Sequence, residues 1–177
     1  MSNVGKYVWT AILIAIAVHL AAINLMPRVL MHVAFERVGG AQGNVWHIAD
    51  RVTPLSRNIV RPSPDFAYSA CAYDLGNGPV VIAAAPWSAY WSLSLYADNS
   101  DNFFVIDDRE ARFGAEITVI RAGRPHPEGA SMVVESPSGR GIALIRRLAP
   151  TLESYNGAVA VAREDVCAPA ASLPPAS

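Results

Sequence analysis

The fold is decided by residues 66–84, which read FAYSACAYDLGNGPVVIAA. Between Phe66 and Leu75 the side chains alternate with a period of two, so successive residues face opposite sides of a strand. The sequence GNGP that follows is typical of a tight turn, because Gly and Asn accept unusual backbone angles and Pro fixes one. A short apolar run at residues 80–84 then predicts a second strand.

The same period continues towards the C-terminus. Trp91, Leu93 and Leu95 fall on one face of residues 90–96, and tyrosines and serines fall on the other. Further short strands are predicted at residues 105–107, 116–121, 132–135 and 142–147. Glycine and proline turns separate these segments, and regular short strands of this kind are typical of an antiparallel sandwich or barrel. The predicted fold is therefore mainly β.

Short helices are expected on both sides of the strands. Asn44 is a good N-cap, apolar residues follow it at helical spacing, and Pro54 ends that segment. A second helix opens at Thr151 and is weakened by Gly157. The segment 167–177, rich in Ala and Pro, is predicted to be a disordered tail.

An apolar run occupies residues 7–26, which contain no charged side chain. At about 1.5 Å per residue it can cross the roughly 30 Å apolar layer of a membrane. Tyr7 and Trp9 stand at one end, where aromatic rings favour the headgroup level. A cleavable signal peptide is the alternative, but its apolar region would be shorter and followed by small residues. The run favours an uncleaved transmembrane anchor with a helical stalk.

The chain thus divides into four parts. They are an anchor with its stalk at residues 1–38, a linker with a short helix at 39–57, an exported β domain at 58–166, and the tail at 167–177. Basic residues are too evenly placed around the anchor for the positive-inside rule to orient it. Two cysteines, Cys71 and Cys167, suit an oxidising compartment and would allow a disulfide. Two buried free thiols are the alternative.

The composition excludes some classes of protein. The 177 residues carry 14 Lys and Arg against 15 Asp and Glu, a net charge of −1. A nucleic-acid-binding domain would usually show a basic stripe, so no nucleic-acid partner is expected. The sequence has no phosphate-binding loop, dinucleotide fingerprint, HExxH, CxxC or nucleophile elbow, and no cofactor is expected.

An acidic run begins at Asp98 and extends to Asp108. Oxygen-rich runs of this kind bind hard cations such as Ca²⁺. The run lacks the glycine and the distal glutamate of an EF-hand, and Asp and Asn also make turn hydrogen bonds in solvated loops. Both interpretations stay open, whereas His32, His47 and His126 are too scattered for a metal site.

Several elements occur in a defined order between residues 58 and 165. They are Arg61-Pro-Ser-Pro-Asp65-Phe-Ala-Tyr68-Ser69, Asp74-Leu75, Gly78-Pro79-Val80-Val81, an aromatic strand from Tyr90 to Asp98, Asn102-Phe103, Arg109, Ser136-Pro137 and Arg146-Arg147-Leu148. This order resembles the bacterial exported family catalogued as domain of unknown function 1254. Pro64 and Phe66 depart from the Asn and Thr that stand there in the family.

The resemblance implies a β-rich, jelly-roll-like domain. Together with the apolar run at residues 7–26, it implies a location in the bacterial inner membrane, with a single span and the C-terminal domain in the periplasm. A second domain, number 1214 of the same catalogue, often accompanies this one. The expected partner is therefore a separate protein that carries the 1214 domain, or a second copy of this chain.

Two functions agree with these observations. The first is a membrane-anchored structural or ligand-binding β module that docks on a partner protein. The second is an envelope enzyme, in which Asp74 and Asp98, each at the end of a strand, pair as acid and base, or in which a pocket of the β-sandwich holds a Ca-dependent site. The candidate site residues are Asp65, Tyr68, Asp74, Asp98, Arg109 and Arg147. The module is favoured over the enzyme, because these residues also suit turn caps, packing and ion pairs.

Overall fold

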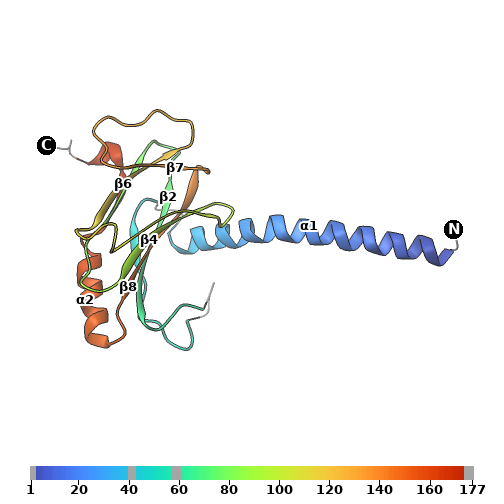
Figure 1. The fold of residues 1–177 in the computed structure, drawn as a ribbon, viewed down its shortest axis with the longest axis horizontal. Coiled ribbons are helices and arrows are strands. Elements are labelled where there is room, and N and C mark those ends of the chain that lie inside the picture. Colours follow the sequence, from blue (N-terminus) through green and yellow to red (C-terminus); the bar gives the residue numbers. More distant parts are fainter. Residues whose placement is uncertain (1–2, 40–42, 57–60, 174–177) are drawn as a thin grey trace.

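The computed structural model describes residues 3–39, 43–56 and 61–173. It contains two β-sheets, a long N-terminal helix that projects away from them, and a short second helix on the far side (Figure 1). The prediction of a mainly β chain with an N-terminal apolar helix is therefore confirmed.

The first sheet has the strand order β1-β2-β8-β4-β5, and all its neighbouring pairs are antiparallel. Its strands are β1 Trp46–Ile48, β2 Phe66–Asp74, β4 Trp91–Ala97, β5 Asn102–Asp107 and β8 Arg140–Leu148. The second sheet has the order β7-β6-β3-β9. Its strands are β3 Val80–Ala84, β6 Ala115–Arg121, β7 Val133–Ser136 and β9 Val166–Pro169. Since β8 lies between β2 and β4, neither half of the chain completes the first sheet alone.

One core lies between the two sheets. Leu93 and Leu95 of β4 are completely buried, as are Ile117 and Val119 of β6. They belong to a single cluster that also contains Trp91, as the alternation in the sequence predicts. Period-two alternation therefore predicts the face of β4 that is turned towards the core.

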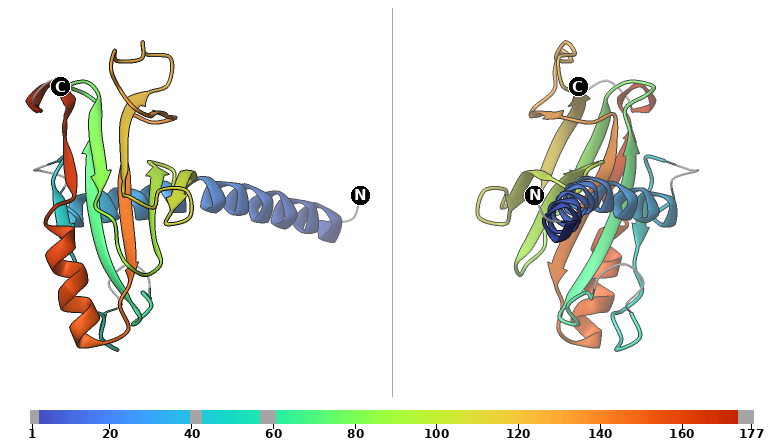
Figure 2. Two further views of the ribbon diagram at one scale, coloured as in Figure 1. Left: turned by 60° about the vertical axis from the view of Figure 1, so that its left-hand side comes forward. Right: turned by 90° about the vertical axis from the view of Figure 1, so that its right-hand side faces the viewer.

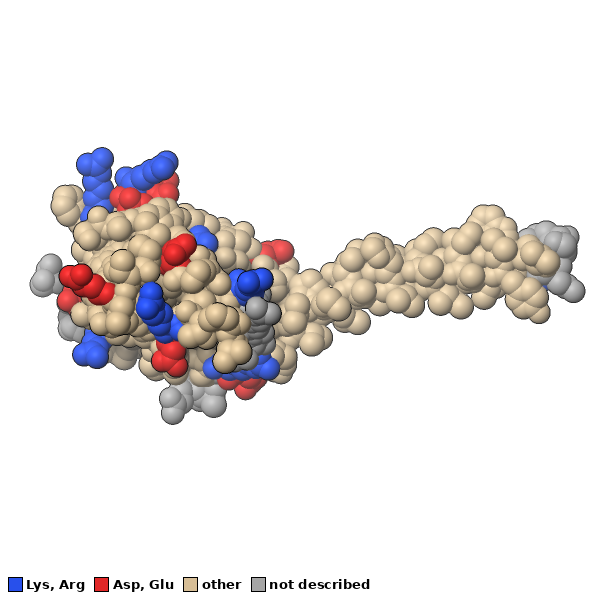
Figure 3. Space-filling model, turned by 90° about the horizontal axis from the view of Figure 1, so that it is seen from below, with Lys and Arg blue, Asp and Glu red and all other residues tan. Residues whose placement is uncertain are grey.

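Helix α1, Asn3–Arg37, runs without a break through Pro27. It is long and apolar enough to cross a membrane, a property that membrane anchors and signal sequences share. Figure 3 shows charged residues over the β domain, whereas the projecting part of α1 shows none in that view. Figure 2 (right) shows α1 projecting towards the viewer in front of the long strands, which lie broadside.

The C-terminal end of α1 is packed against the first sheet. Met31 and Phe35 are buried there, and the guanidinium of Arg140 on β8 lies 5.8 Å from the ring centre of Phe35. Ser100, in the loop between β4 and β5, donates a hydrogen bond to the Pro27 carbonyl at 2.9 Å. These contacts hold the helix end in a defined position on the domain.

The helix predicted after Asn44 is wrong. Trp46–Ile48 pairs with β2 as strand β1, and Asn44 has a positive φ of 66° instead of starting a helix. Its side-chain amide accepts a hydrogen bond from the Asp74 N–H at 3.0 Å and donates one to the Asp74 carbonyl at 3.4 Å. The free backbone edge of β2 thus outweighs the local helical pattern.

The predicted tail is also wrong at its start. Cys167 belongs to β9, and the 3-10 helix η2, Ala170–Ser172, follows it. The backbone of β9 pairs with β3, which a sequence rich in Ala and Pro does not indicate. Residues 174–177 of the predicted tail, 40–42 of the linker and 57–60 at the domain boundary lie outside the described residues.

The prediction of antiparallel pairing fails at one pair of strands, β6 and β7, which run parallel. A parallel neighbour needs a crossover of about a dozen residues. The loop at residues 122–132 supplies that length, so a segment that the sequence identifies only as a turn returns the chain to the same end of the sheet.

Helix α2, Leu152–Ala162, begins where the sequence predicts it. The Thr151 side chain accepts a hydrogen bond from the Ser154 N–H at 3.1 Å, and the Ser154 hydroxyl accepts one from the Thr151 N–H at 3.0 Å. Packing explains the glycine at position 157, because a Cβ there would lie 3.3 Å from the Trp87 ring. The weak helix former thus permits close contact between α2 and the loop after β3.

Candidate functional site

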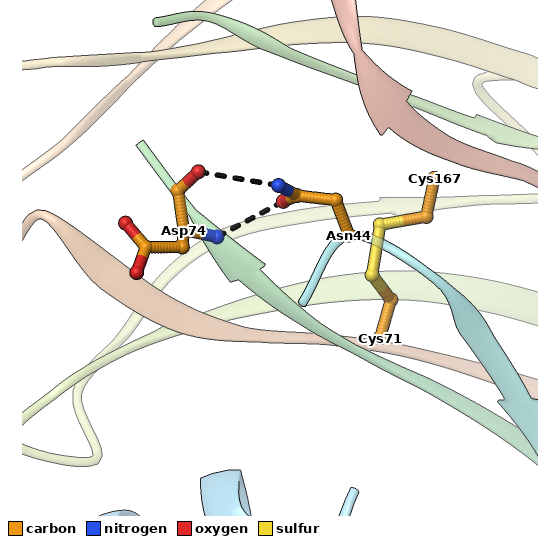
Figure 4. The surroundings of a disulfide bond; sticks show 4 residues. All are labelled: Asn44, Cys71, Asp74 and Cys167. Atoms are coloured by element: carbon orange, nitrogen blue, oxygen red, sulfur yellow. Dashed lines mark hydrogen bonds between the residues drawn. A yellow bond between two sulfur atoms is a disulfide. The ribbon is translucent and has the colours of Figure 1, made fainter. Parts of the chain in front are cut away.

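The two sheets are joined by a disulfide. Cys71 on β2 and Cys167 on β9 are bonded, with their Cα atoms 6.6 Å apart and a sequence separation of 96 (Figure 4). Both side chains are buried in the core. Of the two alternatives that the sequence leaves open, the structure therefore has the bond.

A buried ion pair joins the same parts of the molecule. Arg147 on β8 donates to both carboxylate oxygens of Asp165, at 2.8 and 2.6 Å, and to the Ala85 carbonyl at 3.0 Å. Asp165 also accepts from the Ala85 N–H at 2.9 Å. The two side chains are 2% and 0% exposed, so Arg147 is committed to structure and is closed to any ligand.

Asp74 and Asp98 do not form a pair of adjacent carboxylates. Their strands β2 and β4 are separated by β8, on which Arg140 lies opposite Asp74 and Gly141 lies opposite Ala97. Asp74 accepts from Arg140 at 2.8 Å and caps the Gly76 N–H at 2.8 Å. The adjacent pairing of β2 and β4, on which the predicted acid/base pair depends, is wrong, because β8 lies between the two strands.

The remaining candidates make local contacts. The Tyr68 hydroxyl accepts from the Ser63 N–H at 3.0 Å, and the Asp65 N–H contacts the Ser63 hydroxyl at 3.4 Å. Arg109 is exposed and its backbone N–H donates to the Asp107 carboxylate at 2.9 Å. The β2–β8 register places Tyr68 at the same end of the first sheet as Arg147, because Ala67 lies opposite Arg147, but the Arg147 guanidinium is bound to Asp165.

The acidic run is organised by turn hydrogen bonds. Asn99 donates to the Asp101 carboxylate at 2.5 Å, and the Asp101 N–H donates back to Asn99 at 3.2 Å. Within residues 3–39, 43–56 and 61–173, no three His, Cys, Asp or Glu side chains are grouped as a metal site would need. His126, one of the scattered histidines, lies 3.2 Å from Glu135 on the surface.

A groove lies where α1 meets the first sheet; we call it the anchor groove. Its volume is about 420 Å³. It is lined by Arg28, Met31, His32, Phe35, Asp98, Gly139, Arg140 and Gly141. Of these residues only Asp98 is a site candidate from the sequence, because the two walls are some seventy to a hundred residues apart in the chain and follow no motif.

A second groove, which we call the edge groove, lies near β5 and β6 and has a volume of about 310 Å³. Phe113, which is 95% exposed, lines it together with Ile106 and Met132. An exposed aromatic side chain beside a partly apolar groove is a common feature of interaction surfaces.

Tyr73 links the sheets through its hydroxyl. It lies 3.1 Å from the Ser136 hydroxyl of the second sheet and donates to the Tyr96 carbonyl at 3.3 Å. Burial raises the pKa of Tyr73 to about 12; the charge of Asp98 acts in the same direction, and the hydrogen bond to Ser136 opposes it.

This pKa predicts a loss of stability in alkali. Because the folded chain holds the Tyr73 proton more tightly than the unfolded chain, the contribution is complete below pH 10 and is lost as the pH rises to about 12. We expect the wild-type chain to lose up to about 3 kcal/mol more than Tyr73→Phe over that range. Denaturant titrations of both proteins in detergent would measure the free energy of unfolding at each pH. If that free energy falls equally in both proteins as the pH rises, the prediction is contradicted.

These features define a class of protein: a two-sheet β domain carried on a long apolar helix. The chain belongs to the family described as Protein of unknown function (DUF1254), whose model matches residues 42–169. The resemblance seen in the sequence is thereby confirmed. A comparison with curated proteins finds no match.

A solved structure shares the fold, and a second is reported beside it. The VPA0106 protein from Vibrio parahaemolyticus is 15% identical, with a TM-score of 0.62 over 85% of this chain and 35% of that chain. A putative uncharacterized protein from Burkholderia cenocepacia is 16% identical, with a TM-score of 0.44 over 73% of this chain and 37% of that chain. The chain thus spans about a third of each of these relatives.

Proposed function

We propose that this protein is a single-pass anchored module of the bacterial inner membrane, with a jelly-roll-like domain in the periplasm that docks on a partner protein. The observation that carries the proposal is the docked end of α1. Met31 and Phe35 are buried on the domain, and the helix continues outward as an exposed apolar rod. Cleavage at the end of the apolar run would cut close to this contact, which favours retention of the helix as an anchor.

A module is favoured over an enzyme by the condition of the candidate side chains. Arg147 is sealed in an ion pair, Asp74 is held by Arg140, and Tyr68 accepts a backbone hydrogen bond. A general acid or base needs a free proton-transfer group aimed at a substrate. These contacts engage Arg147, Asp74 and Tyr68 in structure.

The proposed partner is a separate protein that carries the companion 1214 domain. Support comes from the relatives, in which this fold makes up about a third of a longer chain. The edge groove with Phe113 is the proposed contact, because a partner would cover its exposed ring.

The topology is tested by export. An export-dependent reporter fused after Ser177 should be active, and alkaline carbonate should leave the full chain in the membrane. If a reporter that works only in the cytoplasm is active when fused at the same position, the proposed orientation is overturned. Release of the chain by carbonate would overturn the anchor.

The partner is tested in detergent-solubilised native membranes. Wild-type protein should run as a complex whose mass and peptides include a protein with the companion domain. Phe113→Ser should reduce that complex about tenfold, the effect of losing one buried aromatic contact. Leu55→Ser is the matched control, since Leu55 is 88% exposed and does not line the edge groove. A monomer, or a complex of identical chains, would contradict the proposed partner.

A further inference from the structure

The depth of the anchor groove follows from the length of α1. If residues 7–26 span the apolar layer, as proposed above, Pro27 lies at its boundary. From Pro27 to Phe35 the helix rises about 12 Å. A bilayer of about 40–45 Å with a 30 Å apolar core leaves about 5–8 Å of headgroups on each side. The groove between Arg28 and Phe35 therefore begins within the headgroup layer.

The opposite wall of the groove reaches the same depth. Ser100, at the tip of the β4–β5 loop, is hydrogen bonded to the Pro27 carbonyl. Asp98 stands in the same loop, and its backbone is held by the Ser138 hydroxyl at 3.1 Å. The helix and the loop thus form two walls of the groove near the proposed membrane surface.

The walls carry opposite charges. Arg28 donates one N–H to the Asn24 carbonyl and has further N–H donors. The Asp98 carboxylate accepts no hydrogen bond from the described residues. Met31 and Phe35 supply an apolar floor, and Arg140 at the back is already paired with Asp74. A ligand suited to this arrangement has a phosphate for Arg28, an ammonium for Asp98 and an apolar part between them.

We propose that the anchor groove binds the headgroup of a zwitterionic phospholipid with a primary amine, such as phosphatidylethanolamine. The Arg28 guanidinium contacts the phosphate, since guanidinium groups match the geometry of phosphate oxygens. The Asp98 carboxylate accepts from the ammonium, which has three donors. A trimethylated choline headgroup has no N–H to donate, and a glycerol headgroup has no positive charge.

The inference rests on the proposed membrane anchor and adds a lipid preference to it. The full chain in detergent is exposed to equal amounts of ethanolamine, choline and glycerol phospholipids, and bound lipid is counted by native mass spectrometry. Ethanolamine lipid should exceed each of the others about tenfold, the effect of one hydrogen bond between charged groups. Equal binding of the three lipids would overturn the proposal.

Single substitutions test the contribution of each wall to lipid binding separately. Arg28→Gln should lower ethanolamine lipid binding about tenfold, and Asp98→Asn should remove the preference over choline lipid. Arg163→Gln, after the end of α2, removes an exposed arginine outside the groove and should change neither. Unchanged binding in both groove variants, with melting temperatures equal to wild type, would overturn the site.

A soluble headgroup distinguishes the source of the phosphate. Glycerophosphoethanolamine at the same concentration should fail to displace the lipid, because it lacks the chains that hold the lipid beside α1. Displacement at equal concentration would identify a soluble phosphate ester as the ligand and overturn the lipid. Carbonate extraction reports separately on the anchor: a chain that stays in the membrane without lipid preference disproves the groove and leaves the anchor standing.

Discussion

Replacing Arg147 by alanine should destabilise the domain by about 3–5 kcal/mol, the usual result of leaving one charge of a buried pair without its partner. Asp165 would remain completely buried with its negative charge opposed by only the Ala85 N–H. Arg147→Lys should recover part of the loss, because one ammonium cannot donate to both oxygens and to the Ala85 carbonyl in the same fork geometry. Thermal and denaturant unfolding of the full chain in detergent would measure both.

The matched control is the neighbouring arginine on β8. Arg146 is half-buried and contacts the Ser92 hydroxyl at 3.2 Å, but it has no ion pair among the described residues. Arg146→Ala should cost about 1 kcal/mol or less. Joint replacement by Arg147→Met and Asp165→Asn should restore much of the stability, since no charge is then left buried. An Arg147→Ala variant as stable as Arg146→Ala would refute the role of Arg147 as the partner that neutralises buried Asp165.

Loss of the Cys71–Cys167 disulfide should be the other large effect. A bond that closes a loop of 96 residues stabilises the folded chain by up to about 4–5 kcal/mol in the chain-entropy model, and usually by less in practice. Cys71→Ala with Cys167→Ala, or wild type under reductant, should therefore unfold at lower denaturant concentration. The doubly substituted protein should be indifferent to reductant, which separates the bond from other effects of the reagent.

The bond itself is tested by alkylation. Unreduced protein, denatured in the presence of iodoacetamide, should gain no mass, and the same protein should gain two labels after reduction. Two labels without reduction would show free thiols and disprove the bond. Because Asp165 and Cys167 are close in the chain, we also expect the losses from the two changes to be non-additive.

Much of the β domain follows from period-two alternation. The strand predicted at residues 80–84 is observed as β3, and the alternating run at 90–96 becomes β4 with Trp91 and Leu93 turned inward. Alternation alone cannot show that an edge is free. Residues 46–48 and 166–169 became strands because they meet the exposed edges of β2 and β3, which are formed by distant residues.

The candidate site was less predictable. Residue type correctly indicates that Arg147 pairs with a carboxylate, but Asp165 as that partner depends on the packing of β8 against the segment before β9. Asp74 and Asp98 each end a strand as predicted, yet their separation depends on β8 entering between β2 and β4. Strand order is set by non-local pairing, which short-range patterns do not encode.

The sequence by itself determined the apolar helix, the mainly β class, the family and the position of most strands, because these depend on hydrophobic period, turn residues and ordered motifs within short segments. Tertiary structure alone decided which strands are neighbours, which charges are sealed in the core and where α1 ends on the domain. The anchor groove shows the reason: Arg28 and Asp98 belong to elements that carry no mutual signal in sequence, and they face one groove only because the end of α1 and the β4–β5 loop are fixed by Phe35 and Ser100.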